Sequence, residues 1–170
     1  MAAKYLVQVA GAILEKLGIV TSAGAGDADK LVSTDSSGRI DSTLMPVGFG
    51  SETFTAVASE AIAAGDFVNV YSNAGTINIR KADATAPAKF ANGFVLSAVA
   101  SSGTGTVYYG NLNTAQTGLT IGVLHYLSAT TPGKATATAP TGTGQIVQQL
   151  GTAKSGSELL VEIQQTIQLA

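Results

Sequence analysis

Short stretches in which apolar and polar residues alternate dominate the chain from Ser51 to its end. Alternation with a period of two is typical of β-strands that bury one face, and runs of this length are too short for most helices. A few runs, such as residues 67–71, are bounded by turn-forming residues on both sides. We therefore predict strands at residues 53–58, 67–71, 76–80, 94–100, 106–109, 123–127, 134–138, 145–150 and 159–167.

Turn-forming residues separate these predicted strands in pairs. Segments rich in Ser, Asn, Gly and Pro lie where hairpin turns are expected, at residues 72–75, 101–105, 131–133 and 154–157. About eight or nine short strands with no room for helices between them predict an all-β fold. We expect a small antiparallel β-sandwich or barrel, jelly-roll-like, in residues 51–170, which we call the β domain.

The first 50 residues follow a different pattern. Within residues 5–17 the apolar positions recur at steps of three and four, which predicts one stripe along a helix that ends at Gly18. Gly11 interrupts this segment, and residues 5–9 could equally form a short strand. A helical and an extended structure therefore both remain open. The apolar positions are Tyr5, Leu6, Val9, Ile13 and Leu17.

The rest of this region has the character of a linker and an anchor. Residues 21–29 are small and polar without periodicity, which favours a linker or an extended segment. Residues 30–32 could form a brief strand, and residues 35–38 predict a turn in which Asp35 bonds the backbone ahead of it. An apolar cluster then ends in a proline. Its members are Ile40, Leu44, Met45 and Pro46. We call residues 1–50 the arm.

Composition narrows the classes of protein to consider. Charged residues make up 12% of the chain, about half of the usual share of roughly 25%. A net charge of −2 gives no electrostatic reason to expect nucleic acid or an anionic membrane as a partner. Residues 4–20 are too few and too charged to span a bilayer, and no small-residue cleavage site follows them, so we expect neither a membrane span nor a signal peptide. The surface is either bland, rich in Thr, Ser and Gly, or covered by other protein.

Residues that carry out catalysis are scarce. The sequence has no Cys, which excludes disulfides and thiolate metal sites. Its single His, His125, lies in the predicted strand at residues 123–127, and alternation places it opposite its neighbours, toward solvent or a subunit contact. No nucleophile elbow and no phosphate-binding loop occurs. We predict that the protein is not an enzyme and uses no cofactor or metal.

Two local features leave weaker alternatives open. Asp27 and Asp29 begin like a calcium-binding loop, but apolar residues follow where further oxygen ligands belong, so turn-forming carboxylates are the preferred interpretation. Tyr108 and Tyr109 are adjacent, so they point to opposite faces of a strand and only one of them can stack on a sugar.

Two sets of segments carry a resemblance to a known family. The first set lies in the arm, at residues 21–28, 30–32, 35–41 and 45–48. The second lies in the β domain, at residues 63–71, 80–85, 91–95, 118–128, 146–148 and 150–153. Over nearly the whole chain, these segments resemble the head decoration, or capsid cement, proteins of tailed bacteriophages.

The resemblance implies a structural virion protein that binds the outer surface of an expanded capsid and stabilises contacts between major capsid protein subunits. It implies two partners, the major capsid protein and further copies of the chain in a homotrimer, and assembly on the virion after synthesis in the host cytoplasm. An arm that folds on its partner would suit this role. We expect the capsid contacts at Tyr5, Leu6, Val9, Ile13, Leu17, Arg39, Ile40, Leu44, Met45 and Pro46.

A second interpretation concerns the β domain. Similar β modules occur in tail fibres and other phage appendages, so the chain could be a tail-fibre or adhesin module that binds a host-surface glycan. Its binding residues would then lie in loops near Tyr108 or Tyr126. The two interpretations differ in the part of the chain that they need.

Overall fold

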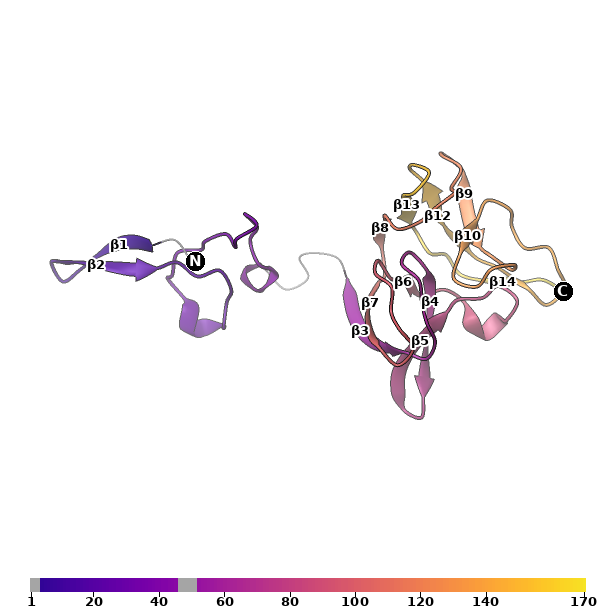
Figure 1. The fold of residues 1–170 in the computed structure, drawn as a ribbon, viewed down its shortest axis with the longest axis horizontal. Coiled ribbons are helices and arrows are strands. Elements are labelled where there is room, and N and C mark those ends of the chain that lie inside the picture. The colour runs from indigo at the N-terminus through magenta and orange to yellow at the C-terminus, as the bar shows by residue number, and fades with distance from the viewer. Residues whose placement is uncertain (1–3, 46–51) are drawn as a thin grey trace. The chain divides into compact units, whose positions relative to one another are not determined.

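The computed structural model describes residues 4–45 and 52–170 and is all-β, which confirms the predicted fold class. The chain divides into two compact units, residues 1–50 and 51–170. Within the described ranges, helical structure is confined to short 3₁₀ turns at Ala25–Asp27, Ser42–Leu44 and Pro87–Lys89. Figure 1 shows the strands of each unit.

The arm contains a β-hairpin of β1 (Lys4–Val9) and β2 (Ala12–Leu17). Ala10 and Gly11 connect the strands with φ values of 49° and 85°. Two successive residues with positive φ form the type I′ turn that suits the twist of a hairpin. Gly11, which interrupts the helical pattern, is thus the residue that makes the hairpin, and the structure decides for the extended arm against the helical one.

Loops follow the hairpin. An isolated parallel bridge joins Ile19 to Val32, where a brief strand is predicted. Asp35 Oδ1 accepts hydrogen bonds from the backbone N–H groups of Ser37 (2.8 Å) and Arg39 (2.9 Å). These two bonds confirm the predicted aspartate turn.

The β domain begins with a closed five-stranded barrel (Figure 1). Its strands, in spatial order, are β3 (Thr53–Ala58), β5 (Thr76–Lys81), β4 (Phe67–Asn73), β6 (Gly93–Phe94) and β7 (Thr104–Tyr108). β3 and β5 pair in parallel, and the other neighbours pair antiparallel. An odd number of strands cannot alternate direction around a closed ring, so one parallel pair has to occur. The expected antiparallel arrangement therefore holds at every pair but that one.

A second, open sheet also has five strands and is antiparallel throughout. In spatial order its strands are β10 (Ala135–Thr136), β9 (Leu124–Leu127), β12 (Gln149–Ala153), β13 (Leu159–Val161) and β8 (Asn111–Asn113). A further short pair is formed by β11 (Ile146–Val147) and β14 (Ile167–Gln168).

The predicted strand at residues 94–100 is wrong beyond Phe94. Within this stretch Phe94 alone pairs with β7, whereas the Val95 N–H donates to the Asp66 carbonyl (3.1 Å) and Val99 forms an isolated bridge with Ile62. The turn around Asp66 takes the backbone bonds that a longer strand would have offered to β7. The other predicted hairpins, β4–β5, β9–β10 and β12–β13, are confirmed with shorter strands or turns.

Two hydrophobic cores stabilise the β domain. One gathers side chains of the barrel and its connections, namely Ala56, Ala58, Ile62, Val68, Ile79, Val95, Val99 and Val107. The other joins Phe67 and Phe94 of the barrel to the second sheet, including Leu127, Leu150 and Leu159. Phe67 and Val68 are neighbours on β4 and point into different cores, which explains why β4 begins with a run of buried residues.

Candidate partner-binding arm

The hairpin of the arm has two faces. Residues paired directly across an antiparallel hairpin share a face, and neighbours along a strand lie on opposite faces. The first face carries Tyr5, Val7, Val9, Ala12, Leu14 and Lys16. The second face carries Lys4, Leu6, Gln8, Ile13, Glu15 and Leu17.

The hairpin divides the predicted apolar stripe between these faces. Tyr5 and Val9 lie on the first face, whereas Leu6, Ile13 and Leu17 lie on the second. The two-residue turn causes this division. Each face carries odd-numbered residues from one strand and even-numbered residues from the other. The predicted contact residues of this segment therefore cannot all meet one flat partner, and each face offers an apolar surface of its own.

Side-chain exposure on both faces is high. Leu6 and Ile13 are each 71% exposed and Leu17 is 58% exposed, while Val9 and Leu14 on the first face are half covered. An isolated two-stranded hairpin is marginally stable in water. Full burial of a Leu or Ile side chain contributes about 1.5–3 kcal/mol. A partner that covered either face would therefore stabilise the hairpin itself.

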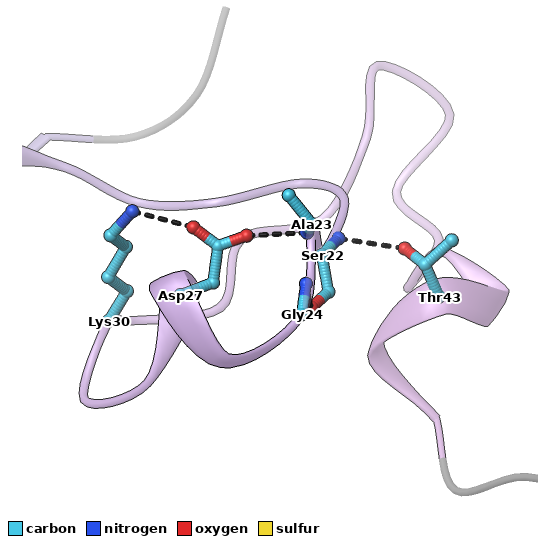
Figure 2. Close-up of polar contacts among 6 residues, drawn as sticks. All are labelled: Ser22, Ala23, Gly24, Asp27, Lys30 and Thr43. Carbon is cyan, nitrogen blue, oxygen red and sulfur yellow. Dashed lines mark hydrogen bonds and ion pairs between the residues drawn. The ribbon is translucent and has the colours of Figure 1, made fainter.

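Polar contacts hold the loop after the hairpin, as Figure 2 shows. The Ala23 N–H donates to Asp27 Oδ2 (2.6 Å), and Lys30 Nζ donates to Asp27 Oδ1 (2.6 Å). The Ser22 N–H donates to Thr43 Oγ1 (2.8 Å), which ties this loop to the region of the predicted anchor. The hydrogen bond from the Ala23 backbone, together with Lys30, keeps the pKa of the Asp27 carboxyl below its usual value.

Two further carboxylates of the arm form turns in the same way. Asp41 caps the turn at Ser42–Leu44, where its Oδ1 accepts bonds from the Thr43 hydroxyl (2.7 Å) and the Thr43 N–H (2.9 Å). These bonds lower the pKa of Asp41. The backbone N–H of Arg39, and to a smaller extent that of Ser37, lowers the pKa of Asp35. The arm is therefore shaped by ionised carboxylates rather than by a hydrophobic core.

The predicted anchor lies around the turn that Asp41 caps. Ile40 is 54% exposed, Arg39 is exposed, and Leu44 and Met45 are half-buried. Pro46, the last residue predicted to contact a partner, lies outside the described residues. The exposed Ile40 adds a third apolar surface to the two faces of the hairpin.

The calcium alternative has no support in the geometry. Both carboxylate oxygens of Asp27 already accept hydrogen bonds, one of them from the ammonium of Lys30. Within residues 4–45 and 52–170, no group of three or more His, Cys, Asp or Glu side chains could hold a metal ion. Asp27 is a turn-forming residue.

His125 is buried, with 2% of its surface exposed, and the expectation that it faces solvent or a subunit contact is wrong. Its neighbours Leu124 and Tyr126 are the half-exposed residues of β9. Nδ1 lies 2.9 Å from the Val123 carbonyl, and Nε2 lies 3.4 Å from the Thr120 nitrogen. The tautomer with its proton on Nδ1 satisfies both nitrogens, so His125 serves the structure of this turn.

Asp66 is a buried carboxylate of the β domain. It is 1% exposed, and Lys134 Nζ lies 2.6 Å from its Oδ1. Its Oδ2 accepts a hydrogen bond from the Ala63 N–H (2.9 Å). Asp66 is therefore held by one ion pair and one backbone hydrogen bond, and the ion pair links the turn before β4 to the loop before β10.

The adjacent tyrosines point to opposite sides, which confirms the prediction. Tyr108 is half-buried and stacks on Phe94, with ring centroids 5.6 Å apart. Tyr109 is 44% exposed and stacks on Phe54, with centroids 5.3 Å apart. Tyr109 is therefore the tyrosine that could meet a ligand, and half-buried Tyr126 is less available.

Two features escape the sequence reasoning. The sequence did indicate the turn at Ala10 and Gly11, because a glycine lies there between two short apolar-rich runs. No sequence pattern indicates the groove on the β domain, because its lining comes from separate parts of the chain, namely residues 90–92, Tyr109, Gln148 and residues 161–166.

No helix in the part of the chain that the structure describes is long and apolar enough to cross a membrane. Comparison of the chain with protein-family models, with curated proteins and with solved structures finds no match in any of the three.

Proposed function

We propose that this chain is a structural virion protein of the capsid cement type. Its arm binds the outer surface of an expanded phage capsid and stabilises contacts between major capsid protein subunits. One observation carries the proposal: Leu6, Ile13 and Leu17 of the arm are each more than half exposed and the described part of the arm buries no apolar side chain, whereas the β domain has two hydrophobic cores of its own. The sequence resemblance supplies the identity of the partner.

The two faces of the hairpin suit a protein that joins neighbouring subunits. A helix with one apolar stripe would contact one surface, whereas a hairpin that is apolar on both faces can lie between two. Burial of both faces would order the arm at the moment of binding. The free energy of ordering is then offset by the apolar area that leaves water.

The β domain supplies the folded body of the proposed cement. Its cores do not depend on the arm, since they contain only residues of the β domain. Self-association as a trimer would present several arms to the shell at once, and the attachments would add through multivalency. No single arm then needs a high affinity.

Sedimentation with capsid shells tests this function. The full-length chain is mixed with empty expanded shells of the cognate major capsid protein, and unexpanded shells serve as the comparison. We expect co-sedimentation with the expanded shells. The double variant Leu6→Ser/Ile13→Ser removes apolar surface from the second face and should lower binding at least about tenfold.

A matched control is Ile121→Ser in the β domain, because Ile121 is 68% exposed and so resembles Ile13 in exposure. This control should bind as the parent chain does. The variant Val9→Ser/Leu14→Ser probes the first face and should also lose binding if the hairpin lies between two subunits. Binding to neither kind of shell, or equal binding by all variants, would exclude the cement function.

A further inference from the structure

The β domain carries an open groove with a volume of about 650 Å³. It is lined by Phe90, Ala91, Asn92, Tyr109, Gln148 and residues 161–166. This volume falls within the range of sites that bind small molecules. All of its lining residues belong to the β domain, so the groove is independent of the arm.

Gln148 fixes the floor of the groove. It is 2% exposed, its Oε1 accepts a hydrogen bond from the Ala91 N–H (2.7 Å), and its Nε2 donates to the Ala91 carbonyl (2.9 Å). The same Nε2 also donates to the Gln164 carbonyl (3.2 Å). One buried side chain therefore connects the two walls, residues 90–92 and residues 161–166.

Each wall is also held from behind. Asn69 Nδ2 donates to the Phe90 carbonyl (2.8 Å), and Arg80 Nε donates to Asn69 Oδ1 (2.9 Å). On the other side, the N–H groups of Glu162 and Gln164 continue the pairing with β12 (2.8 and 3.0 Å). The groove is thus formed before any ligand arrives, which lowers the entropic cost of binding.

Two aromatic rings contribute to the lining. Tyr109 is 44% exposed and is held by its stacking on Phe54, and Phe90 is 38% exposed. An aromatic face packs well against the C–H groups of a pyranose ring. A tyrosine fixed by a stacking neighbour loses little conformational entropy when it makes such a contact.

The remaining side chains are polar and almost uncharged. Asn92 Oδ1 accepts a hydrogen bond from the Val70 N–H (2.8 Å), which orders this amide and leaves its Nδ2 to donate. Gln164, Gln165 and Thr166 add amide and hydroxyl groups. Glu162 is the charged residue of the lining, so the groove disfavours anionic ligands.

We propose that this groove binds a neutral oligosaccharide. The sugar rings pack on Tyr109 and Phe90, and their hydroxyls bond to the amide, hydroxyl and carboxylate groups along the walls. The open shape allows a chain of several sugar units to enter and leave at the ends. This site goes beyond the proposed cement function and does not depend on it, since a decorated capsid could use it to hold a host-surface glycan.

A saccharide titration with the full-length chain tests the site. The probes are maltotetraose, cellotetraose, chitotetraose and a mannotetraose, with sialyllactose as an anionic saccharide and a proline-rich peptide as a different ligand class. Saturation-transfer NMR and calorimetry measure binding at millimolar concentrations. We expect at least one neutral tetrasaccharide to bind, and sialyllactose to bind more weakly than that ligand.

Variants assign the binding to the groove. Tyr109→Ala should weaken the bound tetrasaccharide about tenfold, because it removes one ring platform. Phe90→Ala should weaken binding to a similar extent. If Tyr109→Ala does not fold, Phe90→Ala alone tests whether the saccharide binds in the groove. Tyr5→Ala, an aromatic change in the arm, is the control and should leave saccharide affinity unchanged.

Three results would overturn the proposal. They are no binding of any neutral tetrasaccharide, binding that survives both groove variants, and preference for the peptide or the anionic saccharide over every neutral probe. Capsid binding is read separately by sedimentation, so failure of the saccharide site and failure of the cement function can be told apart.

Discussion

The arm and the β domain use the same local structures in different surroundings. Both contain a hairpin closed by an Ala-Gly turn with nearly equal φ values, 49° and 85° at Ala10 and Gly11, and 49° and 86° at Ala74 and Gly75. Both also contain a Lys–Asp ion pair at 2.6 Å. Local geometry alone therefore does not distinguish the two units.

Burial separates them. In the described part of the arm only Gly18 is buried, whereas the β domain encloses two clusters of buried apolar side chains. Turn chemistry and strand pairing can thus shape a segment, while cores stabilise it. The comparison predicts that equivalent substitutions will have unequal effects in the two units.

The largest difference is expected for leucine truncation. Leu150 is fully buried beside Phe67 and Phe94 in one core, whereas Leu6 is 71% exposed. Leu150→Ala should lower the free energy of unfolding of the β domain by about 3–4 kcal/mol, through lost burial and a cavity. Leu6→Ala should change it by less than about 0.5 kcal/mol. Urea unfolding of the two variants measures both values, and equal losses would mean that the arm is part of the cooperative unit.

Glycine substitution should give the next largest difference. Gly65 has a φ of +80°, and a Cβ there would collide with the Ala115 carbonyl. Gly38 has a φ of +74° with open space around it. Gly65→Ala combines backbone strain with a steric clash and should destabilise the β domain by about 2–3 kcal/mol.

Gly38→Ala is the matched control for this substitution, because it brings a similar strain without a clash and lies in the arm. Its unfolding midpoint in urea should stay at the value of the parent chain. A loss of stability as large as that of Gly65→Ala would contradict the assignment of the effect to the clash.

The two ion pairs should differ by a smaller amount. Lys134→Met leaves the buried carboxylate of Asp66 without its cation and should cost about 1–2 kcal/mol, a value reduced because Lys134 is 40% exposed. Lys30→Met removes the partner of Asp27 in the arm and should not shift the urea midpoint. If Lys134→Met also leaves the urea midpoint unchanged, the burial of Asp66 has no effect on the free energy of unfolding.

The sequence predicted those parts of the fold that depend on neighbouring residues. The alternation at residues 53–58 matches β3 residue for residue, and the hairpins β4–β5, β9–β10 and β12–β13 follow from their turns. The parallel pairing of β3 with β5 could not be predicted, because closing a ring of five strands is a property of the whole barrel.

The candidate sites were predictable only in part. Apolar residues at steps of three and four are typical of a helix. The same residues also fit two strands when a turn is placed at Ala10 and Gly11. The spacing of the apolar residues therefore did not decide between a helix and a hairpin. For His125, alternation gives which residues share a face but not which face is buried. The groove escaped because Gln148 joins segments that are distant in the sequence, and no local pattern marks such a contact.

The smallest expected effect is a response of the arm to acid. Hydrogen bonds to the ionised carboxylates lower the pKa values of Asp27, Asp35 and Asp41. The main donors are, in the same order, the Ala23 N–H, the Arg39 N–H and the Thr43 hydroxyl.

A lowered pKa means that the folded arm favours the charged form of each carboxyl. Its contribution is therefore fully present above the ordinary pKa of about 4 and is lost as the pH falls through the lower value in the folded arm. NMR titration of the Ala23, Arg39 and Thr43 amides measures this directly. Each amide should keep its shift at neutral pH and move with a midpoint below that of a free aspartate, while amides in the cores, such as that of Leu150, stay unchanged over the same range. Midpoints at or above the ordinary value would show that the carboxylates do not shape the arm, and the contrast with the β domain would then rest on apolar burial alone.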